Sequence, residues 1–421
     1  MTDNFILKNV KIKDSKEPCD IFVSEGIIKR IGKNISEENT EVFDCTGLNV
    51  INGLFDMHVH FRDPGFTHKE DIITGTRSAL AGGVTGVLCM PNTNPPVDNP
   101  ETLKYIYDKA RDTGVEVRQT VCITKGMKGN ELCDYEELKN AGASALSDDG
   151  RPVENAELMR KALELSNKNN LLITSHCEDL SIINGGIMNK GIISEKLGVK
   201  GMDRASENTI TAREIILAES VNARIHIAHV STAESIEIIR QAKKNGIRVT
   251  CETCPHYFML TDEKLLAEDA DFRMNPPLRT QNDVNAVIEG IIDGTVDCIV
   301  TDHAPHTAEE KKIFSKAPNG VVGLETSLSA TLTALYHTGK ISLQRVIELM
   351  SVNPRKILGL EIHDIKEGEC AEFTVVDLER VWTVEPEKLH SKSKNTVFKG
   401  MTLKGKPLMT VTKGKIRYNE M

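Results

Sequence analysis

Eight short apolar runs alternate with amphipathic segments across the middle of the chain, and this alternation most constrains the fold. The candidate strands lie at 51–60, 84–91, 116–124, 143–148, 171–177, 224–230, 247–254 and 297–302. Segments with a helical pattern, such as 70–82, 100–112, 154–168, 207–221 and 233–245, lie between most of them. Strands of a parallel barrel are buried on both faces and read as nearly continuous apolar runs. The pattern therefore predicts an α/β fold, a (β/α)8 TIM barrel over residues 49–367.

A competing architecture is an open, doubly wound α/β sheet. Such a sheet normally carries a glycine-rich phosphate-binding turn after its first strand. Here that position holds His58-Val59-His60. Side chains two apart in a strand share a face, so both imidazoles can reach one metal ion, although two ordinary surface histidines would give the same motif. We therefore favour the barrel, with half of a metal site at the end of its first strand.

The two ends of the chain differ from the middle. Residues 1–48 and 368–421 contain short alternating runs, such as Asp20-Ile-Phe-Val and Leu408-Met-Thr-Val, separated by glycine and charge. Alternation of this kind is typical of strands with one buried face. We expect both termini to join in one small, discontinuous β-sandwich domain beside the barrel.

The composition excludes some classes of function. The 421 residues carry a formal net charge of −9 and a pI near 5.8, whereas binding to nucleic acid requires a basic surface. The sequence shows neither an apolar run of about 18 residues nor a basic start followed by an apolar stretch. We expect a soluble, cytoplasmic protein without nucleic acid or membrane partners, in which the ten cysteines are reduced.

Further metal-binding residue types occur at the ends of later strands. The complete set is His58, His60, Asp149, His176, His229 and Asp302. Any one of these residues alone could be a helix cap or a buried polar residue with a hydrogen-bond partner. Such structural roles do not explain why all of them follow apolar runs. The carboxyl ends of barrel strands meet at one face, where active sites form. Four histidines and two carboxylates are a donor set for two divalent cations, with Zn²⁺ as the expected metal.

Cys251, Cys254 and His256 form a weaker metal candidate. No second cysteine pair follows at the spacing of a zinc finger. The segment also lies in a β-rich run, where small thiols pack as apolar groups. We therefore predict a buried strand rather than a structural zinc site at this position.

Seven short motifs, spread over nearly the whole chain, carry a family resemblance. They are Asp56-Met-His-Val-His-Phe-Arg-Asp-Pro-Gly, Met90-Pro-Asn-Thr, Ser147-Asp-Asp-Gly, Ser175-His-Cys-Glu, Ala228-His-Val-Ser, Met274-Asn-Pro-Pro-Leu-Arg and Thr301-Asp-His-Ala-Pro-His. Together they resemble the amidohydrolase superfamily and, most closely, the class I dihydroorotases. The resemblance implies zinc-dependent, reversible cyclisation of N-carbamoyl-L-aspartate to L-dihydroorotate and water, a step of pyrimidine biosynthesis.

The resemblance also implies roles for the metal-binding residues. It places His58, His60 and Asp302 on a first ion, and His176 and His229 on a second. Many superfamily members bridge the two ions with a carboxylated lysine, but this chain has only acids at the fourth strand. The class I pattern places the bridge on Asp149 and leaves Asp148 in a supporting or loop role. Asp302 would be the catalytic proton acceptor and donor.

The same resemblance predicts the substrate contacts. Arg62 can grip a carboxylate through two hydrogen bonds, whereas its alternative is a salt bridge with Asp63. The family pattern adds His60, Asn92, Asn275 and His306, together with the backbone around Asn319-Gly320, where an aromatic residue is more usual at the first position. The charged segment 307–318 would form a mobile loop over the site.

Two other functions compete with this one. The segment Glu252-Thr-Cys-Pro-His-Tyr resembles the hydantoinases and allantoinases, but those cyclic amidases usually keep the bridging lysine and lack an arginine at the position of Arg62. Some superfamily members are non-catalytic scaffolds, yet those lose metal ligands, and this chain has lost none. The resemblance leaves open a homo-oligomer and an association with aspartate carbamoyltransferase.

Overall fold

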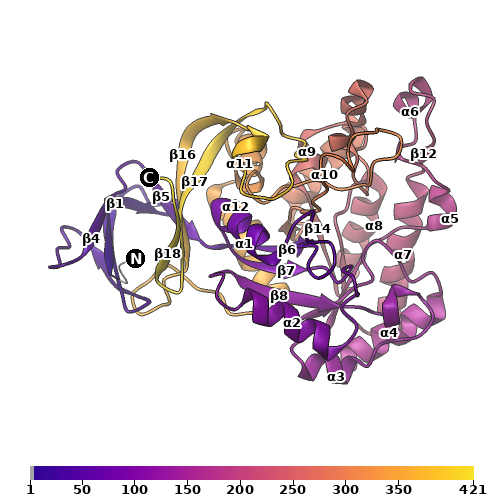
Figure 1. Ribbon diagram of the computed structural model, residues 1–421, viewed down its shortest axis with the longest axis horizontal. Helices are drawn as coiled ribbons and strands as arrows, with labels where there is room; N and C mark the ends of the chain where they lie inside the picture. Colours follow the sequence, from indigo (N-terminus) through magenta and orange to yellow (C-terminus); the bar gives the residue numbers. More distant parts are fainter. Residues whose placement is uncertain (1–3) are drawn as a thin grey trace.

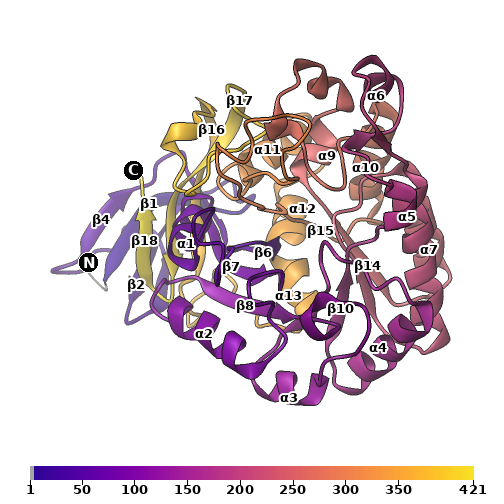
Figure 2. The ribbon, with the colours of Figure 1, turned by 45° about the vertical axis from the view of Figure 1, so that its right-hand side comes forward.

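The structure is a computed structural model and describes residues 4–421. Eight parallel strands form the central sheet (Figure 1, Figure 2). In sheet order they are β6 (Leu54–Val59), β7 (Val84–Cys89), β8 (Glu116–Val121), β9 (Ala145–Leu146), β10 (Leu172–Ser175), β13 (Ile225–Ile227), β14 (Val249–Thr253) and β15 (Cys298–Ile299). A bridge between Val59 and His303 brings the two edges together. The sheet is a nearly closed barrel, as predicted.

Helices cover the outside of the barrel. The main ones are α1 (Ile72–Ala81), α2 (Pro100–Ala110), α3 (Tyr135–Asn140), α4 (Ala156–Lys168), α7 (Ala205–Ser220), α8 (Ala233–Lys244) and α10 (Gln281–Asp293). Several begin at side-chain caps, among them Asp71 before α1, Asn99 before α2 and Thr232 before α8. Such caps satisfy backbone N–H groups that the first helical turn leaves unpaired. The five predicted helical segments are all present.

Shorter elements fill the connections. Between β10 and α7 lie α5 (Leu180–Ile183), β11 (Met188–Asn189), α6 (Ile192–Lys196) and β12 (Gly201–Met202), and α9 (Pro255–Met259) follows β14. After β15 come α11 (Ser327–Thr331), α12 (Leu343–Ile347) and α13 (Asn353–Leu358). In the described part of the chain, no helix has both the length and the apolar character that a bilayer span requires.

The first predicted strand is in fact two strands. The run at 51–60 is divided at Gly53 between β5 (Asn49–Asn52) and β6. A Cβ atom at Gly53 would lie 2.4 Å from Oγ1 of Thr85, so only glycine lets the chain pass this close to β7. Because the apolar pattern continues through the junction, periodicity alone does not reveal the break. β5 belongs to the terminal sheet, and β6 begins the barrel.

Both ends of the chain contribute to one eight-stranded sheet, at the left of Figure 1. It contains β1 (Phe5–Ile12), β2 (Cys19–Ser24), β3 (Ile27–Gly32), β4 (Glu41–Asp44), β5, β16 (Phe373–Thr383), β17 (Thr402–Thr412) and β18 (Lys415–Asn419). Phe5 and Phe373 meet edge to face within its apolar core, with ring centroids 6.5 Å apart. The joining of the termini is confirmed, and the domain limits at 48 and 368 stay predictions.

Candidate metal centre and substrate pocket

The predicted metal ligands all lie at the carboxyl ends of barrel strands. His58 lies near the end of β6 and His60 directly follows it, Asp149 follows β9, His176 follows β10 and His229 follows β13. Asp302 follows β15. His229 and Asp302 have φ angles of +34° and +46°, in the left-handed region that non-glycine residues rarely adopt. Strained backbone of this kind concentrates at functional sites, and here it occurs at two of the predicted ligands.

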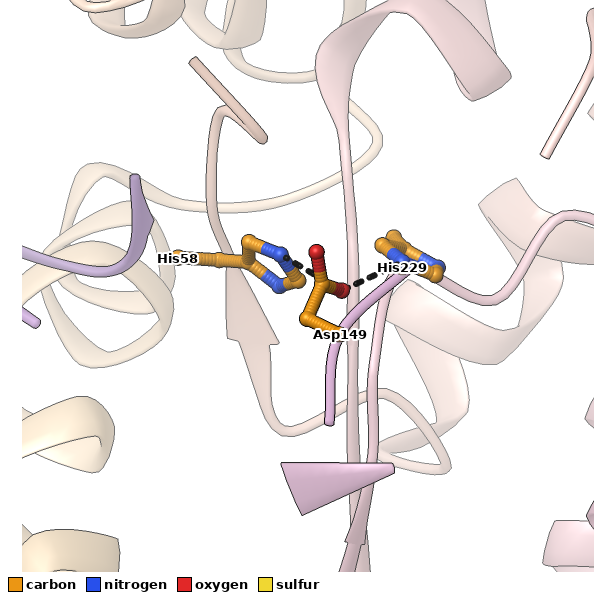
Figure 3. Close-up of side chains that lie close together, drawn as sticks. All are labelled: His58, Asp149 and His229. Atoms are coloured by element: carbon orange, nitrogen blue, oxygen red, sulfur yellow. Dashed lines mark ion pairs between the residues drawn. The ribbon is translucent and has the colours of Figure 1, made fainter. Parts of the chain in front are cut away.

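Asp149 lies at the centre of the histidine cluster. Its Oδ1 atom is 3.5 Å from Nε2 of His58, 3.5 Å from Nδ1 of His176 and 3.7 Å from Nε2 of His229. Its Oδ2 atom is 3.5 Å from Nε2 of His60. Figure 3 shows the carboxylate between the rings of His58 and His229. One carboxylate therefore faces all four histidines, which is the arrangement that a bridging ligand requires.

Asp302 faces the histidines of β6. Its Oδ1 atom is 3.1 Å from Nε2 of His60 and 3.8 Å from Nε2 of His58. Burial by itself raises the pKa of Asp302, but the neighbouring imidazoles, that of His60 first and then that of His58, bring it down to about 2. The carboxylate is therefore ionised at neutral pH and can accept a proton.

Three polar side chains fix the orientation of the histidine rings. Nδ1 of His58 lies 2.6 Å from Oε1 of Glu252, and Nδ1 of His60 lies 2.8 Å from Oδ1 of Asn92. Both oxygens accept a hydrogen bond, so each ring donates from Nδ1 and presents the lone pair of Nε2 to the cavity. Nε2 of His176 similarly lies 3.1 Å from Oε2 of Glu178, which turns its Nδ1 toward Asp149.

The donor set fits divalent cations. Nε2 of His58 and Oδ1 of Asp149 are buried and have no hydrogen-bond partner among the described residues. Buried polar atoms without a partner are rare in native proteins and point to an ion or water. Burial raises the pKa of Asp149, but the nearby imidazoles of His176, His229 and His58 hold it well below its usual range. Imidazole nitrogens around an ionised carboxylate are ligands that zinc prefers.

Two residue groups in the described chain have the spacing of a metal site. They are His58, Asp149 and His229, and His58, His60 and Asp302. Neither group contains a cysteine, and all ten cysteines are free thiols. Cys251 is fully buried in β14, where its Sγ donates to the carbonyl of Thr295 at 3.3 Å. Burial raises the pKa of its thiol to about 12, in keeping with a thiol that packs as an apolar group.

A cavity of about 510 Å³ opens above the metal centre. Its size suits a small molecule. The predicted residues that line it are His60, Arg62, Asn92, Asp149, His176, His229, Asn275, Asp302, His306, Asn319 and Gly320. His58 lies fully buried beneath it. Arg151, which the sequence analysis did not select, adds a further positive charge to the wall.

Arg62 belongs to this cavity rather than to a surface ion pair. Its alternative partner, Asp63, binds Nζ of Lys109 at 2.5 Å and the hydroxyl of Tyr105 at 3.0 Å. The Arg62 side chain instead lies beside His306, with Nη2 3.4 Å from the ring Nε2. A half-buried cation at the edge of the metal centre is suited to bind a substrate carboxylate.

The remaining predicted substrate contacts lie around the same cavity. Nδ2 of Asn275 donates to Oε1 of Glu178 at 2.9 Å, and Nε2 of His306 donates to the carbonyl of Asn319 at 3.0 Å. Gly320 has a φ of +144°, and a Cβ there would lie 2.5 Å from the carbonyl oxygen of Ala304. The backbone at 319–320 therefore approaches the cavity in a way that requires glycine.

The segment 307–318 packs against the rim of the cavity. Lys311 is buried, and its Nζ donates to the carbonyls of Ala270, Arg273 and Pro318 at 2.9–3.0 Å. Glu310 pairs with Lys69 at 2.9 Å. These contacts fix both flanks of the segment, and its mobility stays a prediction.

Glu252 and Glu178 also orient predicted ligands, although neither role was predicted from the sequence. A carboxylate inside a β-rich run such as the one that holds Glu252 is a detectable signal, because charged residues are seldom fully buried without a partner. Asp148 faces away from the cavity and accepts hydrogen bonds from the backbone N–H groups of Ile123 and Thr124. It therefore supports the loop after β8, in line with its predicted role.

A second cavity, of about 540 Å³, lies between α1 and the strands β16–β18. Trp382 and Tyr418 line it, together with Arg380 and Lys406. Both cations pair with Glu420, at 3.4 and 2.5 Å. The positive charge of this cleft is thus neutralised within it, unlike that of Arg62.

Solved structures of known proteins share the fold. An L-hydantoinase (dihydropyrimidinase) from Arthrobacter aurescens superposes with a TM-score of 0.86 at 24% identity, covering 99% of this chain and 96% of that chain. A dihydropyrimidinase from Brevibacillus agri gives the same TM-score at 22% identity, covering 99% and 95%. At these identities the likeness concerns the fold.

Sequence relatives are more specific. A family profile described as "Dihydro-orotase-like" matches residues 47–235. Curated proteins named dihydroorotase are 49% identical in Acetivibrio thermocellus, over 95% of both chains, and 49% identical in Geobacter metallireducens, over 96% of this chain and 95% of the relative. A third, from Citrifermentans bemidjiense, is 47% identical over 99% of both. By this similarity over nearly its full length, the chain belongs to the dihydroorotase family.

Proposed function

We propose that this enzyme, a cyclic amide hydrolase of the dihydroorotase family, catalyses the reversible cyclisation of N-carbamoyl-L-aspartate to L-dihydroorotate and water, in pyrimidine biosynthesis. One observation carries the proposal. The Asp149 carboxylate faces four histidines in the same cavity that Arg62 lines. The cavity thus combines donors for metal ions with a cation suited to the carboxylate of this substrate.

The proposed cofactor is a pair of Zn²⁺ ions. His58, His60 and Asp302 would hold one ion, His176 and His229 the other, and Asp149 would bridge them. Two ions held in this way would lower the pKa of a water molecule and polarise the substrate carbonyl. The buried, unpartnered nitrogen of His58 and oxygen of Asp149 support this assignment.

Asp302 would move the proton. Its ionised carboxylate lies beside the β6 histidines, with Oδ1 3.1 Å from Nε2 of His60. In hydrolysis it accepts a proton and delivers it to the ring nitrogen that leaves. In cyclisation the protonated carboxyl donates to the departing hydroxyl. The fixed ring of His60, which donates to Asn92, keeps the carboxylate aimed at the cavity.

Arg62 would bind the substrate carboxylate, and its neighbours would orient the ring. The ring of His306 lies next to the guanidinium, and its orientation is fixed because Nε2 donates to the carbonyl of Asn319. Asn275 also lines the cavity, where its amide donates to Glu178. His60 and Asn92, next to the metal centre, would contact the reacting end.

A related cyclic amidase is the second candidate, because the hydantoinases share the fold. Turnover by the purified protein should be measured with dihydroorotate, hydantoin and allantoin, alongside its metal content. We expect dihydroorotate to be the preferred substrate by a wide margin. A preference for hydantoin or allantoin would support the second candidate, and metal-free protein with no turnover of any of the three would support a scaffold.

Three further expectations accompany this proposal. They are a cytoplasmic location, a homo-oligomeric state and an association with aspartate carbamoyltransferase. The first would be tested by cell fractionation and the second by light scattering of the purified protein. Co-purification with a tagged carbamoyltransferase from the same cells would test the third.

A further inference from the structure

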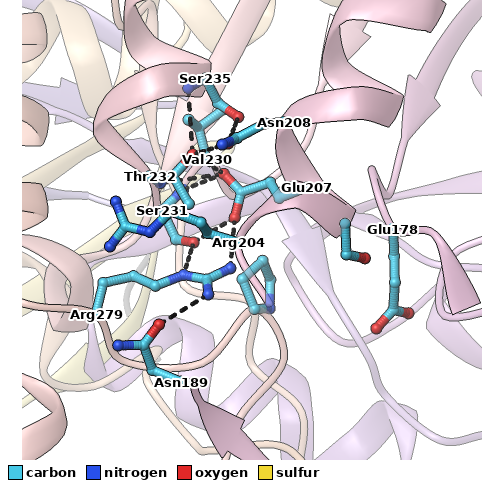
Figure 4. Close-up of polar contacts among 12 residues, drawn as sticks. Glu178, Asn189, Arg204, Glu207, Asn208, Val230, Ser231, Thr232, Ser235 and Arg279 are labelled. Carbon is cyan, nitrogen blue, oxygen red and sulfur yellow. Dashed lines mark hydrogen bonds and ion pairs between the residues drawn. The ribbon is translucent and has the colours of Figure 1, made fainter. Parts of the chain in front are cut away.

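A buried arginine outside the cavity connects two parts of the site. Arg279 is only 3% exposed. Its Nε donates to Oγ of Ser231 at 3.0 Å, one Nη donates to Oδ1 of Asn189 at 3.1 Å, and the other donates to Oε2 of Glu207 at 3.2 Å. Figure 4 shows the guanidinium between Asn189 and Glu207. Every nitrogen of this side chain is therefore engaged, although none contacts a predicted ligand.

One end of this network fixes the loop that carries His229. Glu207 accepts hydrogen bonds from the backbone N–H groups of Ser231 at 2.9 Å and Thr232 at 3.1 Å. Ser231 stands two residues after His229, whose backbone has a positive φ. A strained conformation persists only where its surroundings hold it, and Glu207 and Arg279 supply that hold on one side.

The other end fixes the segment that carries Asn275. Arg279 follows Asn275 through Pro276, Pro277 and Leu278, and the two prolines restrict the backbone between them. The hydroxyl of Tyr257 donates to the carbonyl of Pro276 at 2.6 Å. Because only three residues separate Arg279 from Asn275, and two of them are prolines, a displacement of Arg279 would be transmitted to Asn275.

Asn275 in turn reaches the other histidine of the second ion. Its amide donates to Glu178 at 2.9 Å, and the second oxygen of Glu178 lies 3.1 Å from Nε2 of His176. The segment 275–279 thus contacts the surroundings of His176 at one end and of His229 at the other. These contacts therefore connect the surroundings of the two predicted ligands of the second ion.

We propose that Arg279, paired with Glu207, is a positioning residue that sets His229 and Asn275 together, and so couples occupancy of the second metal position to substrate binding. The inference rests on the proposed function. It goes beyond that function by giving a buried pair a role in the geometry of the site. Neither residue touches substrate or metal, so both act through their neighbours.

The test uses Arg279→Met, Arg279→Lys and the charge-neutral double variant Glu207→Gln/Arg279→Met. Metal bound per chain, KM and kcat for dihydroorotate, and thermal unfolding are measured for each. We expect Arg279→Met to weaken binding of the second ion and to raise KM, each by about 10-fold, the lower end of the range for groups that contact a metal ligand directly. Arg279→Lys keeps the charge and should restore part of both.

Arg204→Met is the matched control. Arg204 pairs with Asp283 at 2.8 Å and Glu234 at 3.0 Å, near the same helices. Its loss should lower thermal stability and leave metal content and KM unchanged. In Arg279→Met the carboxylate of Glu207 is left unpaired, and this alone could cause a defect. The double variant has no such carboxylate, so it should still show the weaker metal binding and the higher KM of Arg279→Met.

A double-mutant cycle tests the coupling itself. If Arg279 acts on substrate through Asn275, Arg279→Met should change KM little further in the Asn275→Ala background. Normal metal content and KM in Arg279→Met and in the double variant, with only reduced thermal stability, would overturn the proposal. Should the wild type fail to turn over dihydroorotate, the proposed function falls, and the metal measurements still decide the positioning role.

Discussion

Oε1 of Glu252 lies 2.6 Å from Nδ1 of His58, and both side chains are fully buried. Burial raises the pKa of Glu252, but the neighbouring imidazoles of His58 and His226 bring it down to about 2. An ionised carboxylate at this distance keeps the proton of His58 on Nδ1. The free Nε2 then points to the space between Asp149 and Asp302.

Replacement of Glu252 by glutamine should therefore weaken metal binding. The substitution keeps the size but removes the charge that fixes His58, and the expected loss in metal affinity is about 10- to 100-fold. Metal titration of the apoprotein measures it. Glu214→Gln is the matched control, because Glu214 is also buried but pairs with Arg213. Equal metal affinity in Glu252→Gln and the wild type would contradict the role.

Removal of metal should abolish turnover, and added Zn²⁺ should restore it. His176→Ala should lower the measured metal content mainly at the second position, because His58, His60 and Asp302 are unchanged. Elemental analysis and far-UV circular dichroism would show fewer ions in a folded barrel. Full activity in exhaustively metal-free protein would exclude the proposed mechanism.

Asp302→Asn keeps the size of the side chain and removes the proton acceptor. Turnover should fall in both directions by about 10²- to 10⁴-fold, as expected for general acid–base catalysis. The pH profiles of the wild type should differ by direction, because hydrolysis needs Asp302 ionised and cyclisation needs it protonated. With its pKa held low, cyclisation should gain as the pH falls. Near-normal turnover by the variant would assign the proton transfer to another group.

Arg62→Met should separate recognition from chemistry. All six predicted metal ligands remain, so the metal content should be unchanged. The substrate carboxylate loses its partner, so kcat/KM for dihydroorotate should fall. The fall should correspond to a loss of about 2–5 kcal/mol of transition-state stabilisation. Dihydrouracil, which lacks the carboxylate, should be a poor substrate whose rate changes little. Equal slowing of both substrates would show that Arg62 is structural.

Lys311 gives a prediction for stability. Burial lowers its pKa from the ordinary 10.5 to about 7. Between these values the unfolded chain binds more protons than the folded one, so the free energy of unfolding rises with pH. Denaturant unfolding from pH 7 to 10 should show the wild type gaining stability relative to Lys311→Met. A difference that stays constant or shrinks over this range would contradict the shift.

The sequence predicted the barrel and the ends of its strands because both depend on local patterns. Apolar runs alternate with helical segments, and residues such as His176 directly follow such runs. The break at Gly53 escaped this reasoning, because an apolar run carries no mark of which sheet its parts join. Glu252 and Arg279 act through contacts with residues distant in sequence, His58 and Glu207 among them. Only the folded chain shows which of these side chains meet.

The position of β5 between strands from opposite ends of the sequence bears on how the protein is made. One edge of β5 pairs with β1, which precedes it in the sequence. Its other edge pairs with β16, which is synthesised only after the whole barrel. During synthesis the barrel strands are therefore complete while β5 still exposes unpaired N–H and C=O groups. An exposed strand edge recruits other chains. Chains interrupted between α13 and β16 should accordingly aggregate even though every residue of the metal centre is in place.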